Sequence, residues 1–164
     1  MPQRLLPPER VLALLTENPR RIAAFTARMT PRQLRTPPTS GAWSANDVLA
    51  HLRSCADVWG GCVTAITATD EPAIRAVNPR TWIKSTGYLQ LEFASSWHAY
   101  LAQRAELLAL LAPLPRNEWS RAATVTGAGA PLRRTVHTYA QWLARHEHSH
   151  VRQFEHIAAA FSGR

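Results

Sequence analysis

The chain has 164 residues, 46% of them apolar, and a formal net charge of +8 at pH 7. This length fits one domain over residues 1–164 with a buried core, and no apolar run reaches the roughly 20 residues that a membrane span requires. The basic residues are scattered arginines apart from Lys84, without the stripe of charge that follows phosphates. These features indicate a soluble, cytoplasmic protein and argue against a nucleic-acid partner, while an attraction for small anionic substrates remains open.

Four segments carry the spacing of apolar residues that is typical of amphipathic helices. In chain order, the expected helices span residues 8–29, 44–69, 88–111 and 132–161. Pro19 is expected to kink or split the first helix, and Ser44 with Asp47 predicts a capping box at the start of the second. Four long helices without a strand-forming run predict an all-α fold, a four-helix bundle.

Two connections between the expected helices are long. The proline-containing stretch 70–86 is expected to lie across the fold and to shape a site, because long ordered connections are often functional. The glycine-rich stretch 124–131 is interpreted as a turn or a short extended piece. These lengths predict a topology other than simple up-down-up-down. Of six tryptophans, Trp43 and Trp82 lie on connections and are the ones expected to line a pocket.

The most informative motif is HEHSH, residues 146–150, which formally matches the H-E-x-x-H pattern of zinc peptidases. His146 and His150 are one helical turn apart and continue the apolar stripe of Tyr139 and Leu143, so they point into the bundle. Two neighbouring buried imidazoles are costly unless each finds a partner. A divalent metal would satisfy both together.

The origin of a third ligand decides the kind of site. Gln153 is a good helix former, so His156 lies about 240° around the helix from His150 and points elsewhere, which excludes the peptidase arrangement. His51, on the second expected helix, can meet the pair if the two helices are neighbours. Three nitrogen ligands with an open position are typical of a catalytic metal site. Cys55, one turn after His51, is an alternative ligand in its place.

Other polar residues of these helices receive weaker or structural assignments. Glu147 is a weak candidate for a catalytic base, because it points about 100° away from His146. Arg53 and Asp57 are expected to form a solvated surface pair. Three further histidines are expected to be surface or packing residues: His98, His137 and His148.

The order and spacing of several pieces resemble the DinB/YfiT-like superfamily of four-helix metalloproteins. The pieces are WSANDVLAHLRSCADVW, DEPAIRAVNPRTW, QRAELLALLAPLPRNEW and RTVHTYAQWLARHEHSHVRQFEHI, and the resemblance extends from residue 8 onward. It implies His51, His146 and His150 as ligands of a divalent metal, zinc or nickel most often. It also implies a homodimer.

The resemblance further suggests an activity. Characterised relatives resemble transferases and isomerases that use low-molecular-weight thiols such as mycothiol or bacillithiol. The implied function is a metal-dependent transferase that activates such a thiol toward a small electrophile, since a metal can lower the pKa of a bound thiol. The alternatives are a metal-dependent hydrolase, a non-catalytic metal- or ligand-binding bundle and, from the family's DNA-damage-inducible name, a DNA-binding protein.

Overall fold

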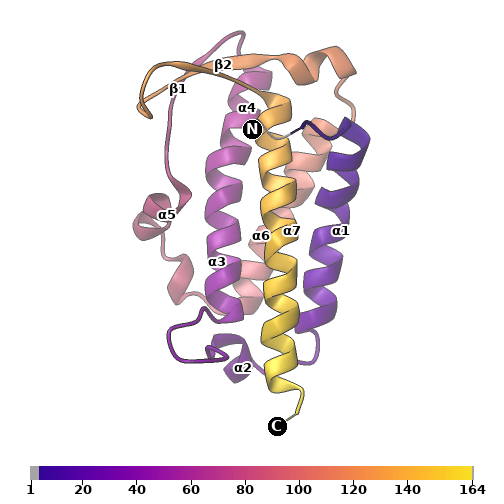
Figure 1. The fold of residues 1–164 in the computed structure, drawn as a ribbon, viewed down its shortest axis with the longest axis vertical. Helices are drawn as coiled ribbons and strands as arrows, with labels where there is room; N and C mark the ends of the chain where they lie inside the picture. The colour runs from indigo at the N-terminus through magenta and orange to yellow at the C-terminus, as the bar shows by residue number, and fades with distance from the viewer. Residues whose placement is uncertain (1–3, 164) are drawn as a thin grey trace.

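The computed structural model describes residues 4–163 and consists of a bundle of four long helical rods with a small sheet over one end (Figure 1). In chain order the elements are α1 (Pro8–Thr26), α2 (Pro31–Arg35), α3 (Ala45–Cys55), the π-helical turn η1 (Ala56–Gly60), α4 (Gly61–Ala68), β1 (Ala73–Arg75), α5 (Pro79–Trp82), the 3₁₀ turns η2 (Ile83–Ser85) and η3 (Tyr88–Gln90), α6 (Phe93–Leu111), the 3₁₀ turn η4 (Arg116–Ser120), β2 (Ala122–Thr126), β3 (Leu132–Thr135) and α7 (Val136–Phe161). Within residues 4–163, no helix combines the length and the apolarity needed to cross a bilayer.

The rods do not alternate in direction along the chain. In Figure 1, α1 and α7 run toward one end of the bundle, whereas α3–α4 and α6 run toward the other. α7 packs against both α1 and the α3–α4 rod, and α6 packs against α3 and α1. The side-chain amide of Asn18 donates to the carbonyl of Ala144, and the backbone N–H of Leu6 donates to Gln141, so α1 and α7 are parallel neighbours. The expected departure from up-down-up-down topology is confirmed.

The helix starts follow local sequence chemistry. The Ser44 hydroxyl accepts a hydrogen bond from the Asp47 backbone, and the Asp47 carboxylate accepts one from the Ser44 backbone, which is the predicted capping box. α1 is one uninterrupted helix around the buried Pro19, so the predicted split is absent. The helix expected from residue 88 begins at Phe93, after the separate turn η3.

The small sheet corrects the all-α expectation. β1 pairs in parallel with β2, and β2 pairs antiparallel with β3, in the strand order β1-β2-β3. Gly127 and Gly129 adopt positive φ angles in the turn between β2 and β3, where a side chain would be strained. The fourth expected helix therefore begins later, at Val136, with Thr135 as its N-cap. Strands of three to five residues are too short to show a reliable alternation of burial.

The apolar core forms two clusters along the bundle. One contains Cys55 and Leu143, and the other contains Leu52 and Val151. His51 of α3 and His146 and His150 of α7 lie near the boundary between these two clusters. The three histidines are therefore flanked by apolar core on both sides along the bundle.

Candidate metal centre

Three imidazoles meet between α3 and α7. The Nε2 atom of His51 lies 2.9 Å from Nε2 of His146, which lies 3.2 Å from Nε2 of His150. The ring centres of His51 and His150 are 5.3 Å apart. Because α3 and α7 are adjacent antiparallel rods, the structure brings together the three histidines that the sequence singled out.

Hydrogen bonding alone does not satisfy this arrangement. A neutral imidazole carries either a proton or a lone pair on Nε2, so His146 forms at most one normal hydrogen bond to its two Nε2 neighbours. Nitrogens bound to one divalent ion at about 2.0–2.1 Å lie roughly 3.0–3.4 Å apart, close to the observed spacing. The donor set therefore fits a divalent metal ion.

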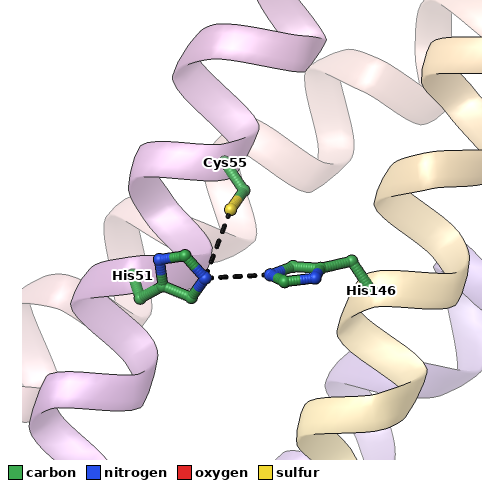
Figure 2. A group of neighbouring side chains, drawn as sticks. All are labelled: His51, Cys55 and His146. Carbon is green, nitrogen blue, oxygen red and sulfur yellow. Dashed lines mark hydrogen bonds between the residues drawn. The ribbon is translucent and has the colours of Figure 1, made fainter. Parts of the chain in front are cut away.

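Cys55 lies beside this cluster rather than in place of His51. Its Sγ atom is 3.7 Å from Nε2 of His51, and Figure 2 shows the thiol pointing toward the His51 ring, which in turn faces His146. The possible donor atoms of His51, Cys55 and His146 all lie within 4.8 Å of one another, so these residues also form a group that could hold a metal ion. Burial raises the pKa of the Cys55 thiol to about 12, whereas a thiol must be deprotonated to bind metal.

The environment keeps the imidazoles neutral. Burial lowers the pKa of both His51 and His146 to about 4, and charge on the neighbouring imidazoles adds to the shift. Burial also lowers the pKa of His150, against a hydrogen bond to Gln153 that raises it. Nδ1 of His150 donates to Oε1 of Gln153 at 2.7 Å, so its Nε2 lone pair faces the other two rings. Neutral rings with free lone pairs are the form that binds metal.

A cavity of about 390 Å³ adjoins the cluster at His51. It is lined by Trp43, Asp47, His51, Arg80, Ile83 and Leu89. The expectation that Trp43 lines a pocket is confirmed, and its ring centre lies 5.3 Å from that of His51. Trp82 lines a separate, mainly apolar groove beside α4. The cavity gives a small molecule access to one of the three imidazoles.

Glu147, the weak candidate for a catalytic base, lies inside the bundle and away from the cavity. Its side chain is fully buried and forms an ion pair with Arg104 of α6. It is absent from the lining of the cavity at His51. Successive residues of a helix are rotated by about 100°, so Glu147 points away from the face that carries His146. Its carboxylate is buried there, and the ion pair with Arg104 compensates its charge.

The predicted solvated pair of Arg53 and Asp57 is also wrong. Arg53 is buried, donates to the Ser96 hydroxyl and lies 3.7 Å above the ring of Tyr88. Asp57 accepts hydrogen bonds from Nε1 of Trp82 and from the Tyr88 hydroxyl. Both residues instead hold the 70–86 connection and the turn after it against the bundle, as expected for a connection that shapes a site.

The remaining histidines lie where the sequence placed them. His98 and His156 are exposed. His137 is hydrogen-bonded to a carbonyl of the N-terminal segment, and His148 to an asparagine of α1. They are surface and packing residues, and the exposure of His156 agrees with the exclusion of the peptidase arrangement.

Sequence reasoning missed Arg80. It follows Asn78, the N-cap of the short helix α5, and faces the cavity from the 70–86 connection. One arginine among many scattered arginines carries no distinguishing signal. The available hint was its place on the one connection expected to shape a site.

Comparisons with known proteins agree with the fold. A family model described as the DinB superfamily matches residues 14–154. A solved structure covers 97% of this chain and 91% of its own, with a TM-score of 0.75 and 19% sequence identity. Its title is "YfiT from Bacillus subtilis is a probable metal-dependent hydrolase with an unusual four-helix bundle topology". Comparison with curated proteins gives no match.

Proposed function

This chain belongs to the DinB superfamily, and from that premise we propose that it is a metal-dependent enzyme acting on a small molecule. The observation that carries the proposal is the meeting of three Nε2 atoms from α3 and α7 beside a cavity. The proposed ligands are His51, His146 and His150, and the proposed metal is zinc or nickel. Three neutral nitrogen ligands leave coordination positions open.

The chain's own residues would prepare such a site for chemistry. A divalent ion held there supplies Lewis acidity, which lowers the pKa of a water or thiol that binds to it. Gln153 accepts a hydrogen bond from the ring of His150 and so orients it, and the apolar walls of the cavity would pack against a bound substrate. Such a site would hold an activated water or thiol next to the cavity in which a substrate could bind.

Two reactions use such a nucleophile. Hydrolysis has the support of the YfiT structure, whose title names a probable metal-dependent hydrolase on the same fold. Thiol transfer to an electrophile is favoured by the cavity lining. Its one carboxylate, Asp47, is engaged by Ser44 in the capping box of α3, so the described lining offers no uncommitted acid to protonate a leaving group. Thiolate attack on an activated electrophile has less need of such an acid.

The first test is metal content by mass spectrometry on untagged wild type and four single alanine variants. We expect about one divalent ion per chain in wild type, in Cys55→Ala and in His156→Ala. The ion should be lost from His51→Ala and His150→Ala, because each removes one of three nitrogen ligands. Loss in Cys55→Ala with retention in His150→Ala would instead assign the site to the group that contains the thiol.

Activity is then compared in the same loaded proteins. One panel offers esters, lactones and amides, and a second offers electrophiles with mycothiol, bacillithiol or glutathione. We expect turnover in one panel by wild type and His156→Ala, and none by His51→Ala. A full metal site without turnover in either panel would indicate a non-catalytic metal-binding bundle.

A further inference from the structure

Arg80 lies at the candidate centre without a protein partner for its charge. It shares the cavity lining with His51, and its positive charge acts on all three imidazoles. Within residues 4–163, no carboxylate lies within ion-pairing distance of its guanidinium. Other arginines of the described chain also lack an ion pair, so the distinguishing feature of Arg80 is its position in the cavity lining beside His51.

The acidic groups near the cavity are committed elsewhere. Asp47 also lines it, but its Oδ2 atom accepts hydrogen bonds from the backbone N–H and the hydroxyl of Ser44 at 2.9 and 2.7 Å. Glu147 is paired with Arg104 inside the bundle. Three neutral imidazoles would leave the charge of a divalent ion uncompensated. With a divalent ion bound, the cavity would therefore offer a positive field to an incoming ligand, and without it Arg80 is the one cation of the lining, opposite in charge to Asp47.

The other walls of the cavity are apolar. Trp43 and Leu89 are 38% and 41% exposed, which is high for large apolar side chains, and Ile83 lies with them in the lining. A small organic molecule that covers these side chains would remove apolar surface from water. The cavity lining thus combines one cation with the apolar side chains of Trp43, Ile83 and Leu89.

We propose that the substrate is a small carboxylate with an apolar or aromatic body, and that Arg80 selects it by binding the carboxylate. This inference deepens the proposed function and rests on it. The apolar body would lie against Trp43, Ile83 and Leu89. A guanidinium binds a carboxylate through two parallel hydrogen bonds, which also fixes the orientation of the rest of the molecule relative to His51.

The test uses benzoate and its neutral isostere benzamide as probes. Their dissociation constants are measured by calorimetric or NMR titration with zinc-loaded and metal-free protein. The variants are Arg80→Gln and the matched control Arg20→Gln, which removes the same charge from an exposed position on α1 outside the cavity lining. Zinc content is measured on each sample.

In wild type and in Arg20→Gln, we expect benzoate to bind at least about tenfold more tightly than benzamide, as one charge-assisted contact implies. In Arg80→Gln the preference should fall to near unity in metal-free protein, with benzamide binding and zinc content unchanged. An equal loss in both variants, or undiminished benzoate binding in Arg80→Gln, would overturn the proposal. If the three-histidine site is not a metal site, wild-type protein will contain no zinc. The benzoate and benzamide affinities of metal-free wild type and Arg80→Gln can still be compared in that case.

Discussion

At the scale of single residues, the hydrogen bond from His150 to Gln153 sets the orientation and the tautomer of the His150 ring. The Oε1 atom of Gln153 accepts from Nδ1 of His150, which leaves the Nε2 lone pair of that ring facing the cluster. Removing such a supporting hydrogen bond typically lowers metal affinity about 10–100-fold. We expect this loss in Gln153→Ala, measured by competition with a chromophoric chelator.

The matched control for this prediction is Gln153→Glu, which retains an acceptor oxygen and should retain affinity near that of wild type. Equal affinity in Gln153→Ala and wild type would show that packing alone orients His150. The sequence suggested Gln153 only as a helix former, because a side-chain hydrogen bond three residues apart depends on rotamers. The pair of His146 and His150 was predictable, since helical periodicity alone places both on one face.

At the scale of elements, one carboxylate on the π-helical turn η1 fastens a connection to the bundle. Asp57 accepts from Trp82 and Tyr88, on either side of η2, and from Gln103 of α6. We expect Asp57→Ala to cost about 2 kcal/mol of unfolding free energy, because it leaves several donors without their charged acceptor. Hydrogen exchange of residues 79–90 should accelerate, while metal content stays the same.

The control is Asp70→Ala, an exposed carboxylate at the start of the same connection, which should leave this exchange unchanged. Unchanged exchange in Asp57→Ala would mean that Arg53 and the backbone contacts hold the connection without it. The sequence could not identify this anchor. Asp57 looked like half of a surface ion pair because its true partners come from segments whose path was unknown.

The same limit explains which elements were predictable. The α3–α4 rod follows from a run of helical periodicity and a capping box, both of which are local. β1 is a strand because it pairs in parallel with β2, which follows α6 in the chain. A three-residue strand has no local signature, so the small sheet over the bundle appears only once the chain is folded.

At the scale of the whole molecule, the parallel pairing of α1 with α7 places the first and last long helices of the chain side by side and leaves α7 next to the α3–α4 rod (Figure 1). His51 and His146 are 95 positions apart in the chain yet share a contact of 2.9 Å. The sequence predicted this meeting only on the condition that the two helices are neighbours. The homodimer implied by the family resemblance stays a prediction.

A metal held by α3 and α7 together would join distant parts of the chain, so its binding should appear as global stability. A ligand that binds only the folded state at 100 times its dissociation constant adds about 2.7 kcal/mol. For a chain of this size, this corresponds to a rise in Tm of about 5–10 °C on zinc addition, measured by calorimetry against protein treated with chelator. His156→Ala should show the same rise. A comparable rise in His51→Ala would place the bound zinc outside the three-histidine cluster, because that variant lacks the only proposed ligand from α3.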